Sequence, residues 1–168
     1  MNIRVLNEAD ALLYQELRLN ALKTDPGGAF ASTYEREVQF SIETVIDRVK
    51  PLKDKFVLGA FNQKGSLCGM VTFVREANEK MAHKGNVFGM YVDVVVRRQG
   101  IGKSLLLELI KTVKKCEGVE QIHLTVVSNH QSAKKLYESI GFKVYGTERN
   151  AIKFNGQYYD EDLMVYFI

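Results

Sequence analysis

One stretch of the sequence decides the fold: residues 90–104, which read MYVDVVVRRQGIGKS. Its first part, Tyr91–Val96, is rich in β-branched residues, which favour a strand. Beyond the glycines, apolar side chains recur at helical spacing from Ile101 to Cys116. We therefore predict a strand that ends at Val96, a tight turn, and a helix over Ile101–Cys116.

The turn between this strand and this helix has the features of an anion-binding site. The first amides of a helix have no partner inside the helix, and the helix dipole adds positive potential there. Phosphate groups bind at such helix starts. Gly100 and Gly102 would let a phosphate approach the backbone, and Arg97, Arg98 and Lys103 add positive charge. The turn is therefore predicted to bind a diphosphate.

Two other phosphate-binding motifs are excluded by single residues. Gly102-Lys103-Ser104 matches the end of a P-loop, but Arg97 stands where that motif needs its first glycine. A dinucleotide-binding turn needs a glycine where Leu105 stands. A plain turn that binds nothing remains the alternative on these residues alone.

The rest of the chain gives an alternation of strands and helices. On the amino-terminal side we predict strand Asn2–Leu6, helix Ala9–Lys23, an aperiodic segment Ala29–Phe40, helix Ser41–Lys50, and an antiparallel pair Lys55–Asn62 and Leu67–Glu76, followed by strand Gly85–Val96. On the carboxyl-terminal side we predict strand Gln121–Val127, helix Gln131–Ile140, a short strand Phe142–Tyr145, a turn at Asn155 and Gly156, and a closing strand that begins at Tyr159 or Leu163 and ends at Ile168. This order predicts an α/β (α+β) fold, a mixed sheet with helices on both faces.

Composition narrows the class of protein further. A chain of 168 residues with 46% apolar and 26% charged residues suits one soluble domain, here residues 1–168. A net charge of +3 is too small to predict a nucleic-acid surface, and no apolar run reaches the ~20 residues of a membrane span. Cys68 and Cys116 match neither a metal site nor a disulfide framework. We expect a cytoplasmic protein without a metal and without nucleic-acid or membrane partners.

Two motifs resemble a known family. Residues 90–102, with Arg97, Gly100 and Gly102 in the defining places, resemble the signature of the GNAT superfamily of N-acetyltransferases, Arg/Gln-x-x-Gly-x-Gly/Ala after a strand. Residues 133–142, AKKLYESIGF, are similar to the later helix of that family and its Tyr-x-x-x-Gly-Phe ending. The resemblance implies a GNAT-like acyl-CoA N-acyltransferase fold. Its sheet would be mostly antiparallel, with a central splayed parallel pair formed by Tyr91–Val96 and Gln121–Val127.

The resemblance also implies a reaction. Acetyl-CoA would be the cosubstrate, and the primary amine of a small molecule, an amino acid or a protein would attack its thioester directly. Backbone groups of Val92 and Val94 would bind the pantetheine arm, and the Val92 amide would polarise the thioester carbonyl. The diphosphate would lie on the turn, whose residues are Arg97, Arg98, Gln99, Gly100, Ile101, Gly102, Lys103 and Ser104.

Tyr137 matches the family tyrosine that protonates the leaving sulfur, a general-acid role that suits a phenol. The alternative is an ordinary core aromatic, because Tyr137 shares a helical face with Ala133, Leu136 and Ile140. The family usually has an asparagine seven residues before this tyrosine. Here His130 holds that position and Asn129 precedes it, so we expect one of the two to contact CoA.

The general base is not visible in the sequence. Phe88, Gly89 and Met90 occupy the strand positions where a carboxylate is usual. More distant candidates are Asp93, His83, Glu35, Glu37, Asp160 and Asp162, and a chain of water molecules is a further alternative.

The acceptor and the assembly are equally open. Loops over 27–40 and 151–162 are expected to shape the acceptor pocket, and their aromatic residues, with nearby acids, favour a cationic amine. The closing strand could pair with its copy in a homodimer. A non-catalytic acyl-CoA sensor and an unrelated nucleotide-binding module remain as alternative functions.

Overall fold

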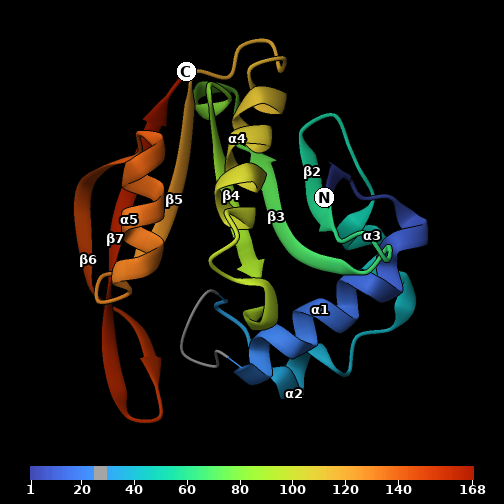
Figure 1. The fold of residues 1–168 in the computed structure, drawn as a ribbon. Coiled ribbons are helices and arrows are strands. Elements are labelled where there is room, and N and C mark those ends of the chain that lie inside the picture. Colours follow the sequence, from blue (N-terminus) through green and yellow to red (C-terminus); the bar gives the residue numbers. More distant parts are fainter. Residues whose placement is uncertain (25–29) are drawn as a thin grey trace.

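The computed structural model describes residues 1–24 and 30–168. Within them, seven strands form one sheet in the order β1-β2-β3-β4-β5-β7-β6, from right to left in Figure 1. The strands are β1 (Asn2–Val5), β2 (Lys55–Phe61), β3 (Leu67–Arg75), β4 (Lys84–Val92), β5 (Gln121–Val127), β6 (Lys143–Phe154) and β7 (Gln157–Phe167). The α-helices are α1 (Ala11–Thr24), α2 (Tyr34–Glu37), α3 (Ile42–Val49), α4 (Ile101–Val113) and α5 (Gln131–Ile140). No helix in the described residues is long and apolar enough to cross a membrane.

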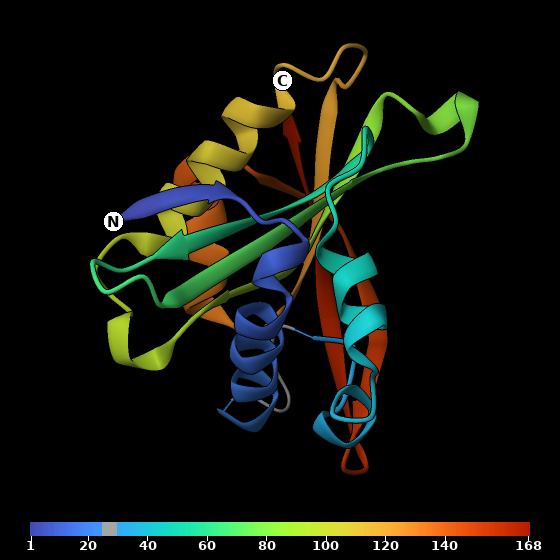
Figure 2. The same cartoon turned by 90° about the vertical axis from the view of Figure 1, so that its right-hand side faces the viewer.

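The two faces of the sheet carry separate cores. Alternate residues of a strand point to opposite faces, and in β2 Leu58 and Ala60 pack in the cluster that contains α4, whereas Val57 and Phe61 pack in the cluster that contains α1 and α3. Figure 2 shows α4 and α5 (yellow and orange) on one side of the strands and α3 (cyan) on the other. The predicted arrangement of helices on both faces is therefore confirmed.

The centre of the sheet opens into a splayed strand pair. β4 and β5 are parallel, and they pair only over 84–86 and 121–123. Beyond Asn86 and His123 the two strands diverge, while every other neighbouring pair in the described sheet is antiparallel. This confirms the predicted mixed, mostly antiparallel sheet with one parallel pair.

The predicted strand end at Val96 is wrong. β4 ends at Val92, and Val94–Val96 form a 3-10 turn, η3. The Asp93 side chain caps this turn by accepting a hydrogen bond from the Val95 amide at 3.0 Å. A local side-chain cap thus outweighs the β preference of the valines.

The carboxyl-terminal hairpin is longer than predicted. The strand that starts after Gly141 extends from Lys143 to Phe154 rather than ending at Tyr145, and β7 begins at Gln157. Segment 151–162, predicted as a loop, is therefore mostly strand. The turn prediction at Asn155 and Gly156 is confirmed, because both have positive φ, 49° and 76°, as a two-residue hairpin turn requires.

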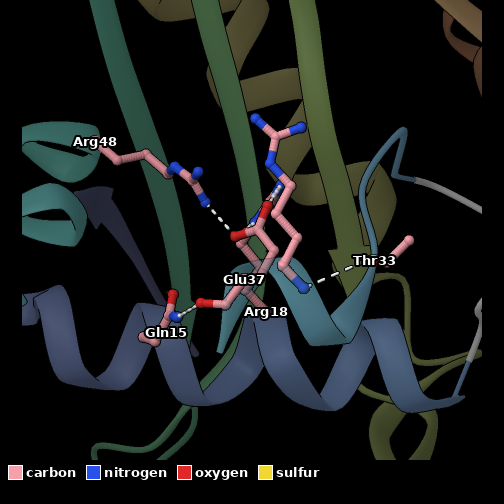
Figure 3. Close-up of polar contacts among 6 residues, drawn as sticks. Gln15, Arg18, Thr33, Glu37 and Arg48 are labelled. Carbon is pink, nitrogen blue, oxygen red and sulfur yellow. Dashed lines mark hydrogen bonds and ion pairs between the residues drawn. The ribbon is translucent and has the colours of Figure 1, made fainter. Parts of the chain in front are cut away.

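A buried ion cluster joins the amino-terminal helices. Glu37, only 1% exposed, accepts hydrogen bonds from Arg18 of α1 and Arg48 of α3 (Figure 3). Gln15 donates to the Glu37 backbone carbonyl at 2.8 Å. Burial acts to raise the pKa of Glu37, but the two guanidinium groups outweigh it and lower the pKa from 4.5 to about 2. The cluster therefore fixes α2 against α1 and α3.

Replacing Glu37 by glutamine should destabilise the fold by about 3 kcal/mol at pH 7, because two half-buried guanidinium groups would lose their buried charged partner. The Glu37 contribution is present above the ordinary glutamate pKa of 4.5 and is lost as the pH falls from 4.5 through about 2. Urea unfolding from pH 7 to pH 2 should therefore show the wild type converging on Glu37→Gln. Glu35→Gln, an exposed change on the same helix, is the control and should be neutral.

Candidate active site

A cavity of about 660 Å³ occupies the gap between β4 and β5. It is lined by residues of β4 and β5, by the start of α4, by α5, and by single residues of β6 and β7. Ala133 and Tyr137 line it on the α5 face of the sheet. Phe88, Thr125 and Glu161 line the part of the cavity that is farther from the start of α4. One cavity thus brings together most of the residues predicted for the site.

The start of α4 forms one end of the cavity. Gly100 is the N-cap, with φ 78°, and no side chain caps the helix. The first intrahelical bond runs from the Ser104 amide to the Gly100 carbonyl at 3.0 Å. The amides of Ile101, Gly102 and Lys103 precede it and have no partner within the helix. These amides can bind an anion, as the sequence predicted.

The structure favours glycine at Gly100 and Gly102 for different reasons. A Cβ at Gly100 would meet no atom within 4 Å, so its positive φ is what excludes most side chains. A Cβ at Gly102 would lie 3.1 Å from Leu136 and 3.2 Å from Met90. A side chain at Gly102 would therefore crowd the packing of α4 against α5 and β4, which is a second constraint on this position; its role in the approach of a phosphate stays a prediction.

Cations surround this helix start. Arg97, Arg98 and Lys103 line the cavity, while Gln99 and Ser104 are exposed and do not. Arg98 has a positive φ of 63°, which folds the turn back toward α4. The potential at this end of the cavity is accordingly positive, although contacts of the turn with a diphosphate stay predictions.

The backbone of Val92 faces the gap. The Asp93 amide donates to the Cys68 carbonyl at 2.9 Å, and hydrogen-bonded pairs alternate along an antiparallel ladder. The amide and carbonyl of Val92 therefore point away from β3, toward β5. Arg97 Nε donates to this carbonyl at 2.9 Å, which leaves the amide to a ligand. Val94 lies in η3 outside the cavity lining, so its predicted role has no support from strand geometry.

Tyr137 lies deep in the cavity wall. Its side chain is 7% exposed and packs edge-on against Phe142. Burial raises the pKa of the Tyr137 phenol to about 12, so the hydroxyl is protonated at neutral pH. It is thus both a core aromatic and a proton donor that lines the cavity, and the two interpretations are compatible. Its role as an acid stays a prediction.

His130, rather than Asn129, lines this cavity. His130 is the N-cap of α5, and its Nδ1 accepts a hydrogen bond from the Ala133 amide at 3.3 Å. In the neutral imidazole the proton is then on Nε2, which can donate to a ligand. Asn129 lines a separate small hollow beside Tyr158 and Tyr159.

The carboxylates suggested as bases are engaged elsewhere. Glu37 is held in the ion cluster, and Asp162 faces α5, where Lys134 donates to it at 2.6 Å. Asp160 binds Arg149, and Asp93 caps η3. His83 and Glu35 do not line the cavity.

The residue that sequence reasoning missed is Glu161 of β7, the one carboxylate among the described residues that line the cavity. Glu161 is a neighbour of two suggested residues in the sequence. Only the strand register, which pairs it with Val127, distinguishes it from them.

A splayed parallel strand pair with an open helix start beside it defines the fold class of the acyl-CoA N-acyltransferases. The acetyltransferase (GNAT) domain family matches residues 3–163. The chain therefore belongs to the GNAT acetyltransferase family.

Individual proteins that resemble this chain either align with only part of it or share a low sequence identity with it. The L-amino acid N-acetyltransferase AaaT of Escherichia coli K12 is 29% identical over 96 residues, 57% of this chain and 59% of that protein. The [ribosomal protein bS18]-alanine N-acetyltransferase of the same organism is 37% identical over 67 residues, 40% of this chain and 45% of that protein. The matches thus span about half the length of these relatives. Among solved structures, yncA of Salmonella typhimurium with acetyl-CoA superposes with a TM-score of 0.81 at 20% identity, covering 99% of this chain and 93% of that one.

Proposed function

We propose that this protein is an acetyl-CoA-dependent N-acetyltransferase that acetylates the primary amine of a small molecule, an amino acid or a protein. One observation carries the proposal. A single cavity is lined by the cationic start of α4, by the gap-facing strand residue Val92 and by the protonated phenol of Tyr137.

The residues present suit each part of acetyl-CoA. The free amides of Ile101–Lys103, with Arg97 and Arg98, would hold the diphosphate. The Val92 amide would donate to the thioester carbonyl, where negative charge develops during attack. His130 Nε2 would donate to the pantetheine arm. The cosubstrate would thus lie along the gap as an added strand does, with its acetyl group at the far side of the sheet.

In the proposed reaction, a neutral amine attacks the thioester carbon, the C–N bond forms and the C–S bond breaks. The sulfur leaves as a thiolate, and Tyr137 gives it a proton. A phenol whose pKa is about 12 is protonated at neutral pH, so its proton is available when the thiolate leaves. A location in the cytoplasm and one domain over 1–168 stay predictions from the sequence.

The names of the relatives agree with an amine acceptor, since one acts on L-amino acids and the other on an alanine of a ribosomal protein. The proposal is tested by mixing the protein with acetyl-CoA and a panel of amines, and by following the release of free thiol. The panel should include amino acids, diamines, and peptides with a free amino terminus. We expect amine-dependent thiol release for at least one class. Tight CoA binding with no release for any amine would instead indicate a non-catalytic sensor.

A further inference from the structure

The end of the cavity opposite α4 is defined by the register of β7. Adjacent residues of a strand face opposite sides. Asp162 faces α5 through Lys134, and Met164 packs in the core beneath α4 and α5. Glu161 therefore faces the other side, beside Thr125 and Val127 of β5. The cavity is lined by residues of both faces, so it passes through the gap between β4 and β5.

Glu161 differs in its charge balance from three of the carboxylates suggested as bases. Glu37, Asp160 and Asp162 each form a salt bridge with a lysine or arginine. Glu161 has no such partner in the described residues. It accepts one hydrogen bond, from Thr125 Oγ1 at 3.4 Å. The half-buried carboxylate thus faces the cavity without a compensating cation.

Burial and a facing carboxylate together make Glu161 a stronger base. Glu148 of β6 lies directly opposite Glu161 and on the same face. Burial raises the pKa of Glu161, and the negative charge of Glu148 raises it further. From β5, the facing residues Thr125 and Val127 do not titrate at ordinary pH. A cation that enters the cavity would relieve this repulsion.

We infer that Glu161 binds the ammonium group of the acceptor and takes its proton, so that the substrate is an amine that arrives as a cation. The inference rests on the proposed function and names a residue and a substrate class for it. The cavity is then divided by charge. Arg97, Arg98 and Lys103 face the phosphates at one end, and Glu161 faces the ammonium group at the other. A molecule without an ammonium group gains nothing from the second end.

Each proton in the inferred reaction has a donor and an acceptor. The ammonium group gives one proton to the Glu161 carboxylate and becomes a nucleophilic amine. The C–N bond forms, the C–S bond breaks, and the thiolate takes the proton of Tyr137. The nitrogen loses its second proton through solvent, which restores the phenol, and Glu161 releases its proton to water. The sum is ammonium plus thioester giving amide, thiol and one proton.

The test compares Glu161→Gln with two variants, using the best amine of the panel. We expect Glu161→Gln to lower kcat/KM for the amine about 100-fold, the low end of general-base effects, with the Kd of acetyl-CoA unchanged within twofold. Glu161→Asp keeps the charge and should recover part of the activity. Glu120→Gln removes an exposed carboxylate outside the cavity lining that has no part in the charge balance of Glu161, and it should stay within threefold of the wild type.

The pH profile separates a base from a structural residue. If Glu161 deprotonates the amine, the deficit of Glu161→Gln should shrink as the pH approaches the pKa of the amine itself, ~10, since the free amine is then already present. An unchanged kcat/KM in Glu161→Gln, an equal loss in Glu120→Gln, or a deficit independent of pH would each overturn the inference while leaving an active acetyltransferase. A wild type that binds CoA but acetylates no amine would overturn the proposed function first, and this inference with it.

Discussion

Replacing Tyr137 by phenylalanine is expected to lower kcat about 1000-fold, within the range that a positioned general acid contributes. The phenol is buried and protonated, and its proton is needed only when the thiolate leaves. Binding of acetyl-CoA should therefore change little, since the ring keeps its contact with Phe142. Steady-state kinetics for kcat and calorimetry for Kd measure the two quantities separately.

Tyr166→Phe is the matched control for this variant. Tyr166 packs against the same Phe142 ring but does not line the cavity, so loss of its hydroxyl should leave kcat within a factor of about two. A kcat for Tyr137→Phe close to that of the wild type would remove Tyr137 from the mechanism. A fall in kcat matched by Tyr166→Phe would point to a packing effect.

Replacing Gly100 by aspartate is expected to weaken CoA binding more than about 1000-fold, since like charges brought together at a binding site cost several kcal/mol. The carboxylate would stand at the N-cap, beside the amides that are to hold the diphosphate. It would also satisfy those amides itself. No neighbouring atom obstructs the new side chain, and aspartate tolerates a positive φ better than most residues, so α4 should remain folded.

Gly100→Asn separates charge from size, because asparagine has nearly the same shape and also adopts a positive φ. It should weaken CoA binding far less than aspartate does. Calorimetry with CoA measures both, and circular dichroism checks the fold. If Gly100→Asp bound CoA with normal affinity, the diphosphate would have to lie elsewhere.

The sequence was sufficient where short-range signals determine structure. The apolar periodicity of α4, the glycine at its N-cap and the turn at Asn155 and Gly156 are local features, and each is confirmed. That Tyr137 and the turn before α4 belong to one site was predicted from two family motifs, not from the apolar periodicity of the helices. Residues 25–29, which include the start of the predicted pocket loop 27–40, lie outside the described residues.

The errors arise where a distant or competing contact decides. The valines of 94–96 favour a strand, yet the Asp93 side chain turns the backbone. β6 is mostly exposed and lies at the edge of the sheet, so its sequence lacks the apolar alternation that would reveal its length. Glu161 could not be distinguished from Asp160 and Asp162 without the register of β7 against β5, which is set by contacts far apart in the chain.

The most direct test of the account is a crystal structure of the protein with CoA. We predict that the diphosphate oxygens accept hydrogen bonds from the amides of Ile101, Gly102 and Lys103, with the pantetheine arm between β4 and β5 and its sulfur next to Tyr137. CoA bound at another surface, or absent from crystals soaked at millimolar concentration, would contradict both the anion site at the start of α4 and the reaction built on it.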